Sequence, residues 1–214
     1  MYRILIADDH PIVLKGLTQI LEESGYVRKI TEVNSGEEAL SAIKEDNFDI
    51  ILLDISMSGM NGIDTLEEIR KLKPSLPVLM LSMYPEKDYA LRAIKAGASG
   101  YLTKKSAPTE LATAINKIAR GGRYISPALA DLIASTLTES SDAPLHERLS
   151  NREFQVLRMI ATGKSLKEIG AEISLSPKTI GTFRSRILQK LNLNSNAELV
   201  RYALKHELFE LPPD

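Results

Sequence analysis

Along residues 1–122, short runs of consecutive apolar residues alternate with longer stretches in which apolar residues recur every third or fourth position. The short runs are RILIAD, KITEVN, FDIILLD, PVLMLS and SGYLTK. The longer stretches include NSGEEALSAI, GIDTLEEIRKLK and DYALRAIKAG, whose spacing is typical of amphipathic helices. Strands that are buried on both faces and joined by helices form parallel sheets. The pattern therefore predicts an α/β domain with a doubly wound, five-stranded parallel sheet.

From about residue 145 the apolar spacing is helical throughout, in REFQVLRMIATG, SLKEIGAEIS, SPKTIGTFRSRILQKLN and SNAELVRYALKHEL. The gap between Ile173 and Ser176 is short, and Pro177 suits the first turn of a helix, which together indicate a helix-turn-helix. Upstream, a helical segment begins near Pro127, and TESSDAP (138–144) is typical of a polar linker. We expect an N-terminal domain over 1–122, a linker with a short helical segment over 123–147, and an all-α domain over 148–214.

Composition narrows the class of protein. The chain has no Cys, which excludes disulfides and thiolate metal sites and fits a reducing cytoplasm. No apolar stretch reaches 18 residues, so we expect neither secretion nor a membrane span. The net charge of −1 hides an asymmetry, because residues 146–214 hold 11 Lys and Arg against 8 acids while residues 1–145 hold 16 against 20. The C-terminal part therefore carries the more basic surface.

Polar side chains stand where the predicted strands end. Asp8 and Asp9 follow the first strand, Asp54 ends the third, Ser82 the fourth and Lys104 the fifth. A single polar residue at a strand end is more often a turn residue or a helix cap. In a doubly wound sheet, however, ligands bind beyond the carboxyl ends of the strands, so these residues should converge. Three acids, a hydroxyl and an amine together favour a functional site.

Electrostatics indicates what such a site would need. Two carboxylates 4 Å apart repel by roughly 4 kcal/mol at an effective dielectric constant of about 20, and Lys104 alone cannot neutralise three of them. A hard divalent cation with oxygen ligands, Mg²⁺ above all, would do so. With the cation bound, a carboxylate can act as a nucleophile toward a phosphoryl group. Asp54 is the candidate, because it is the one acid of its strand end.

The set Asp8-Asp9, Asp54 followed by M-x-G-M-N-G, Ser82, and Gly100-Tyr101 through Lys104 resembles the receiver domain of two-component response regulators over residues 1 to about 122. The resemblance implies a flavodoxin-like fold and phosphorylation of Asp54 by a sensor histidine kinase. It implies Mg²⁺ held by Asp8, Asp9, Asp54 and the Ser56 backbone carbonyl, phosphate contact by Lys104, and a conformational switch at Ser82 and Tyr101. Two alternatives are purely structural: Tyr101 as a half-buried aromatic residue of a strand, and Ser82 as a helix-capping residue. Ser58 stands where the family usually has Pro, so we expect a less rigid loop.

Residues 173–197 contain four basic residues and no acid. The charges of a basic helix usually only face solvent. This helix, however, follows the tight turn of the predicted helix-turn-helix. LSNREFQVLRMIATGKSLKEIGAEISLSPKTI followed by ILQKLNLNSNAELV also resembles the DNA-binding domain of the LuxR/NarL group. This resemblance places the helix from Pro177 to Leu191 in the major groove. The candidate contacts are Lys178, Thr179, Gly181, Thr182, Arg184, Ser185, Arg186 and Lys190. Phe183 stands where the group commonly has His.

We interpret the chain as a transcription regulator and not an enzyme. Phosphorylation of Asp54 would change the receiver conformation and dimerisation and thereby control binding to promoter DNA. The expected partners are a sensor histidine kinase, double-stranded DNA and a second copy of the chain, with RNA polymerase a further candidate. One alternative is a LuxR-type regulator that works without phosphorylation. Another is an Mg²⁺-dependent phosphohydrolase, although Ser56 stands where such enzymes need a second Asp.

Overall fold

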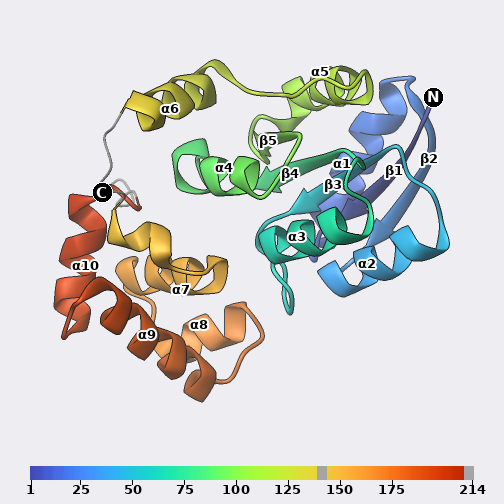
Figure 1. The fold of residues 1–214 in the computed structure, drawn as a ribbon. Helices are drawn as coiled ribbons and strands as arrows, with labels where there is room; N and C mark the ends of the chain where they lie inside the picture. The colour runs from blue at the N-terminus through green and yellow to red at the C-terminus, as the bar shows by residue number, and fades with distance from the viewer. Residues whose placement is uncertain (139–143, 210–214) are drawn as a thin grey trace. The chain divides into compact units, whose positions relative to one another are not determined.

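The structure, a computed structural model, describes residues 1–138 and 144–209 and divides into two compact units, Met1–Thr138 and Glu139–Asp214 (Figure 1). Residues 139–143 of the predicted polar linker lie outside the described residues. The two units are described separately below.

The first unit is built on a five-stranded sheet in the order β2-β1-β3-β4-β5, in which every neighbouring pair is parallel. The strands are β1 (Tyr2–Ala7), β2 (Val27–Val33), β3 (Ile50–Asp54), β4 (Val78–Ser82) and β5 (Gly100–Thr103). The connecting helices are α1 (Pro11–Glu23), α2 (Gly36–Glu45), α3 (Gly62–Leu72), α4 (Glu86–Lys95) and α5 (Ala107–Ala119). The predicted doubly wound α/β fold is confirmed.

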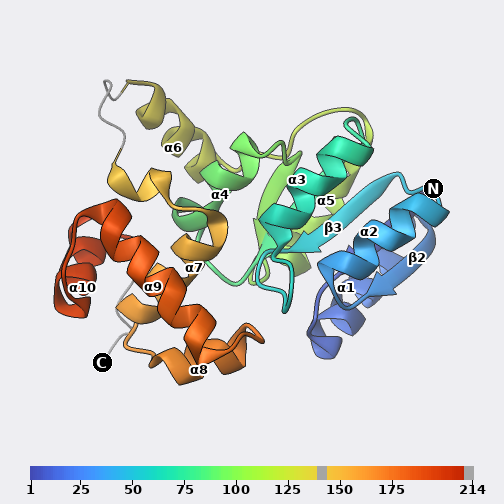
Figure 2. The same cartoon turned by 60° about the horizontal axis from the view of Figure 1, so that its bottom comes forward.

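Helices cover both faces of this sheet. Alternate strand residues point to opposite faces, and Ile4 and Ile6 pack in one core with Leu17 of α1 and Leu111 of α5. On the other face α2 and α3 lie side by side (Figure 2). Every residue of β3 and β4 is buried, which explains why these strands are continuous apolar runs in the sequence.

The register brings the carboxyl ends of the central strands to one edge. Ala7 pairs with Leu53, so Asp8 and Asp54 stand at the same level on neighbouring strands. Ser82 pairs with Thr103, which places Lys104 just beyond the same edge. Residues more than 90 positions apart in sequence thus meet because the strands are parallel and in register.

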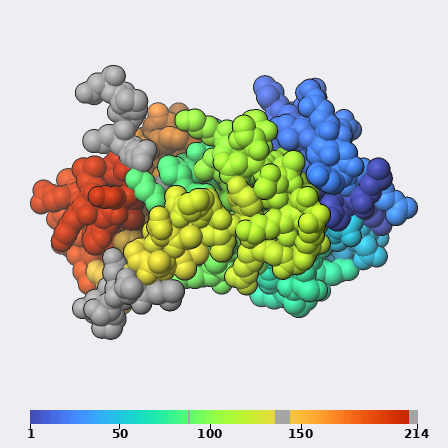
Figure 3. All heavy atoms as spheres, turned by 90° about the horizontal axis from the view of Figure 1, so that it is seen from above, coloured from blue at the N-terminus to red at the C-terminus, as the bar shows by residue number. Residues whose placement is uncertain are grey.

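A sixth helix, α6 (Pro127–Thr138), belongs to the same unit and packs against α4. Leu129 of α6 is fully buried, and Ser126 hydrogen bonds to Glu86 at the start of α4. Figure 3 shows the yellow atoms of α6 lying against green atoms of this unit. The helix expected near Pro127 is therefore present and is docked on the sheet domain.

The second unit contains a short 3₁₀ turn, η1 (Leu145–Arg148), and four helices among its described residues: α7 (Asn151–Ala161), α8 (Leu166–Glu172), α9 (Pro177–Leu191) and α10 (Asn196–Lys205). Ser150 with Glu153 and Ser165 with Glu168 form capping boxes at the starts of α7 and α8. Phe154, Leu157, Ile169, Ile187 and Leu199 are buried, and α7 contacts each of the other three helices. The predicted all-α fold is confirmed.

Candidate functional site

The polar residues at the strand ends do converge. Asp8 and Asp54 are fully buried, and the Lys104 ammonium lies between them, 2.6 Å from Asp8 Oδ2 and 3.0 Å from Asp54 Oδ1. Asp9 lies at the rim of this pocket with 19% of its side chain exposed. His10 also reaches the cluster, and one ligand atom from each of Asp8, Asp9, His10 and Asp54 lies within 4.8 Å of the others.

Burial makes ionisation of Asp54 costly. It raises the pKa of this carboxyl to about 6, with Lys104 opposing the shift and the neighbouring Asp8 charge adding to it. Both oxygens of Asp54 are buried, and Lys104 and the Ser56 backbone favour the charged form of this carboxyl. A buried acceptor of this kind needs a cation or a donor. Three converging carboxylates are oxygen ligands that fit a hard divalent cation such as Mg²⁺.

The loop after β3 contributes a contact that the sequence did not predict. The backbone N–H and the hydroxyl of Ser58 both donate to Asp9 Oδ2, at 2.8 and 2.9 Å. A Pro at this position would supply neither donor. Ser58 therefore ties the loop to Asp9. Ser56 is half-buried on the same loop, and the role of its backbone carbonyl stays a prediction.

Gly62, the last residue of the M-x-G-M-N-G motif, lies directly against the backbone of the candidate nucleophile. A Cβ at this position would lie 2.0 Å from the carbonyl oxygen of Asp54 and 2.9 Å from Ile55 Cα. The Gly62 N–H donates to the Ile55 carbonyl at 2.9 Å. Only Gly permits this approach, so the residue fixes the position of the third strand end.

Ser82 and Tyr101 are linked through the backbone of one residue. The N–H of Tyr84 donates to Ser82 Oγ, and the Tyr84 carbonyl accepts from the Tyr101 hydroxyl, each at 3.0 Å. Both side chains are fully buried. The ring of Tyr84 lies 5.2 Å from that of Tyr89 on α4, the helix that carries α6. A change at Ser82 can therefore reach α4 through a single loop.

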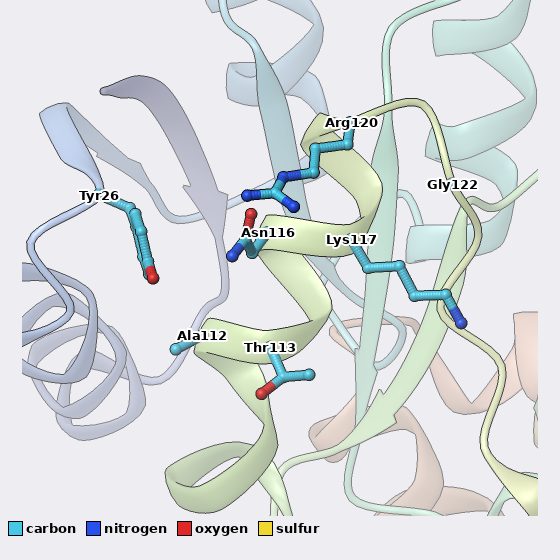
Figure 4. A pocket seen from close by; sticks show the side chains of 7 residues that line it. All are labelled: Tyr26, Ala112, Thr113, Asn116, Lys117, Arg120 and Gly122. Atoms are coloured by element: carbon cyan, nitrogen blue, oxygen red, sulfur yellow. The ribbon is translucent and has the colours of Figure 1, made fainter.

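A cavity of about 520 Å³ lies elsewhere, between the second half of α5 and Tyr26 (Figure 4). Its polar side chains include Asn116, Lys117 and Arg120. Tyr26 precedes β2 and Gly122 follows α5, which places this cavity near the amino ends of the strands, away from the carboxylates. The candidate chemistry is therefore not in this cavity.

The second candidate site is the pair α8 and α9. The Leu175 N–H donates to the Gly170 carbonyl at 2.8 Å, and a Cβ on Gly170 would lie 2.4 Å from the Leu175 oxygen. Ser174 adopts a left-handed conformation at φ 56°, and the Ser176 side chain caps α9 by accepting from the Thr179 N–H. The helix-turn-helix predicted from the short gap is present.

The eight residues that are candidates for DNA contact differ in their exposure to solvent. Lys178, Thr182, Ser185, Arg186 and Lys190 are exposed, whereas Thr179, Gly181 and Arg184 are half-buried. The hydroxyls of Thr182 and Ser185 donate to carbonyls one turn earlier in α9. Arg184 donates to Asn196 of α10. Their contacts with DNA stay predictions.

Lys190 has a role within the domain. Its ammonium lies 2.6 Å from the carboxylate of Glu153, whose side chain is only 4% exposed. Burial works against ionisation of Glu153, but the hydrogen bonds from Lys190 and from the Ser150 backbone hold its pKa below the ordinary value. The pair fastens the end of α9 to the start of α7.

Three comparisons agree with this geometry. Residues 4–116 match the family model of the response regulator receiver domain, and residues 147–203 match that of the bacterial regulatory proteins of the luxR family. Response regulator UvrY of Escherichia coli strain K12 is 33% identical over 210 residues, covering 97% of this chain and 96% of UvrY.

Two RcsB structures are similar along nearly the whole chain. RcsB from Salmonella enterica serovar Typhimurium, bound to promoter rprA in the presence of the phosphomimetic BeF₃⁻, gives a TM-score of 0.64 at 27% identity and covers 94% of this chain and 98% of that one. A structure of two RcsB dimers bound to two parallel DNAs gives 0.60 at 25% identity, covering 95% and 98%.

Over residues 1–138 and 144–209, no helix is both long and apolar enough to cross a membrane. The receiver model alone spans more than half of the chain, and the UvrY similarity spans almost all of it. The chain belongs to the two-component response regulators, with a receiver domain followed by a DNA-binding domain of the luxR family.

Proposed function

We propose that the chain is a DNA-binding response regulator whose promoter binding is controlled by Mg²⁺-dependent phosphorylation of Asp54. The observation that carries the proposal is the buried Asp54 carboxylate, in contact with Lys104 and beside Asp8, in a chain that also holds a helix-turn-helix. We place the protein in the cytoplasm, where the promoter is, with a sensor histidine kinase as phosphoryl donor.

In the proposed reaction, an oxygen of Asp54 bonds to the phosphorus as the bond from phosphorus to the kinase histidine nitrogen breaks. Asp8, Asp9, Asp54 and the Ser56 carbonyl would hold Mg²⁺, which when bound offsets the negative charge of the phosphoryl group. Lys104 already contacts Asp54, so its ammonium is placed to contact the phosphoryl oxygens. The buried strand end keeps the carboxylate in one orientation.

The response would begin at Ser82. A phosphoryl group on Asp54 offers new acceptors at the same sheet edge, and a Ser82 hydroxyl that donates to them would turn away from the Tyr84 N–H. Because the Tyr84 carbonyl accepts from Tyr101, the two side chains would rearrange together. We propose that this movement passes through α4 and changes both dimerisation and the availability of α9.

The α9 helix would read the major groove. Lys178 and Arg186 are exposed cations of α9, whereas Arg184 bonds to Asn196 and Lys190 pairs with Glu153. If both met phosphates in each copy of a dimer, four contacts would give a salt slope of about −4 in log affinity against log salt concentration. The RcsB structures on DNA, one of them with dimers, support this arrangement. We propose residues 1–122 as receiver and 148–214 as DNA-binding domain.

The test compares wild type with Asp54→Asn, each with and without acetyl phosphate and Mg²⁺. Operator affinity is measured by fluorescence anisotropy, and oligomeric state by sedimentation velocity. Wild type alone should respond in both measurements. Equal behaviour of the two proteins would refute control by Asp54 and favour a luxR-type regulator that works without phosphorylation.

A further inference from the structure

The start of α6 is tied to the start of α4 by one side chain. The Ser126 hydroxyl donates to the carboxylate of Glu86, the first residue of α4. The same oxygen accepts from the Leu129 N–H at 3.1 Å, and the Ser126 carbonyl accepts from the Ala130 N–H at 2.9 Å. Ser126 is therefore both the N-cap of α6 and its link to α4. Figure 2 shows the two helices side by side.

The segment that leads into α6 is fixed to the sheet, independently of α4. The Tyr124 N–H donates to the Ser99 carbonyl at 2.9 Å, and the Tyr124 hydroxyl bonds to Glu110 of α5. Tyr124 also forms a bridge with Gly100 of β5, where a Cβ would lie 2.7 Å from the Tyr124 carbonyl oxygen. Only Gly permits this approach. Because the chain is held on β5 as far as Tyr124, a shift of α4 relative to β5 has to be absorbed at Ser126 and beyond.

The other partner in this link follows the Ser82–Tyr101 pair closely along the chain. Glu86 comes two residues after Tyr84, whose N–H donates to Ser82 Oγ and whose carbonyl accepts from the Tyr101 hydroxyl. The residue between them is Pro85, whose ring restricts its φ angle. A change in the backbone of Tyr84 is therefore transmitted to the first turn of α4 over two residues.

The simplest explanation of the link is that α6 completes the receiver domain and keeps the same contacts in every state. The burial of α6 argues against a permanent contact. Over residues 127–135, where the burial of α6 is described, only Leu129 is fully buried, Leu132 and Ile133 are half-buried, and the other residues are exposed. A helix held by so little apolar surface opens locally at low cost. Loss of the bond between Ser126 and Glu86 would therefore release it.

We propose that α6 is a strap that is docked on α4 in the unphosphorylated protein and is released on phosphorylation of Asp54, and that the bond between Ser126 and Glu86 couples the two events. The proposal rests on the proposed function, because it places α6 at the end of the path from Ser82 through Tyr84. Once released, the 12 residues of α6 join the linker to the DNA-binding domain. They add about 18 Å as a helix, or up to roughly 40 Å if extended. Phosphorylation thereby increases the reach of the DNA-binding domain.

The test is hydrogen exchange of α6 peptides, measured by mass spectrometry on the full chain with and without acetyl phosphate and Mg²⁺. The label on Asp54 is quantified in the same samples. In wild type, α6 should exchange roughly fivefold faster or more after phosphorylation, as expected for the loss of a cap and its hydrogen bond. Asp131→Asn is the matched control, because Asp131 is an exposed acid within α6. It should respond as wild type does.

Two substitutions act on the link itself. Ser126→Asp keeps a side chain that caps helices but places a carboxylate against Glu86, so α6 should exchange fast even without acetyl phosphate. Combining it with Glu86→Gln removes the repulsion and should restore slow exchange. This rescue, together with unchanged exchange in α1, separates the link from a general loss of stability. The operator affinity of unphosphorylated Ser126→Asp should move toward that of phosphorylated wild type.

Two results would overturn the inference. One is unchanged α6 exchange in wild type whose Asp54 carries the label. The other is slow α6 exchange in Ser126→Asp without acetyl phosphate. Absence of label on Asp54 would instead refute the proposed function and, with it, the trigger for release. The Ser126→Asp measurement needs no phosphorylation, so it would still decide whether this contact holds α6 on α4.

Discussion

The helix-turn-helix depends on a close approach that a single methyl group should disrupt. In Gly170→Ala the new Cβ would lie 2.4 Å from the Leu175 carbonyl oxygen and 3.5 Å from the Pro177 nitrogen. Both contacts are with main-chain atoms of the turn, which cannot rotate away as a side chain can. The hydrogen bond from Leu175 N–H to the Gly170 carbonyl would have to lengthen as α8 and α9 separate.

The expected change in the free energy of unfolding is the difference between two opposing effects. Ala is the better helix former by about 1 kcal/mol, while overpacking of this kind costs typically about 1–3 kcal/mol and occasionally more. The net expectation is a loss of up to about 2 kcal/mol, which corresponds to a roughly 30-fold rise in the population of the open form. Gly181→Ala is the matched control in α9, because a Cβ there meets nothing within 4 Å. It should gain up to about 1 kcal/mol.

Hydrogen exchange measured by mass spectrometry on peptides from α8 and α9 resolves this unit from the receiver. Gly170→Ala should exchange faster than wild type and Gly181→Ala more slowly. Operator affinity adds a second measurement. Gly170→Ala should bind weakly because α9 is displaced. Gly181→Ala should bind weakly although the domain is stable, if the α9 backbone approaches the groove at this point. Exchange in Gly170→Ala as slow as in Gly181→Ala would refute the close-packing argument.

Three further outcomes are expected. The folded-state pKa of Glu153 is lowered. Its contribution to stability is therefore complete above the unfolded pKa of about 4.5 and is lost as pH falls below that value. Acid unfolding followed by circular dichroism should show a shallower pH dependence in Glu153→Gln than in wild type. Lys190→Met should lower the stability of the C-terminal unit by on the order of 1 kcal/mol, measured by urea denaturation, whereas Lys178→Met should leave stability unchanged and weaken DNA binding at all sequences. Tyr101→Phe removes the hydrogen bond to the Tyr84 carbonyl, which should cost about 1 kcal/mol and reduce the change in hydrogen exchange of the β4–α4 loop on addition of acetyl phosphate.

The sequence was sufficient to predict which residues meet at the sheet edge. Asp8, Asp54 and Lys104 each follow a short apolar run, and parallel strands in register bring such positions together whatever the details of the loops. The helix-turn-helix was predictable because a short gap between Ile173 and Ser176, with Pro177 suited to a first helical turn, favours a tight connection of two helices.

Contacts that depend on loop conformation were not predictable. Ser58 bonds to Asp9 across 49 positions and Lys190 to Glu153 across 37, and neither partner is visible in a local pattern. An acid-free window in the sequence thus did not mean a helix free of acidic partners. His10 and Gly170 did leave signals: His10 adjoins the acid pair, and Gly170 interrupts a helix just before a tight turn, where Gly would otherwise only cost stability.

The most direct test of the central claim is the location of the phosphoryl group. Wild type, Asp54→Asn and Lys104→Met are incubated with radiolabelled acetyl phosphate, with Mg²⁺ or with a chelator, and the labelled residue is identified by mass spectrometry. The account predicts an acyl phosphate on Asp54 in wild type that requires the divalent cation, with no label in Asp54→Asn. Label on another residue of the wild-type chain, or label on Asp54 that forms equally well in the chelator, would contradict it.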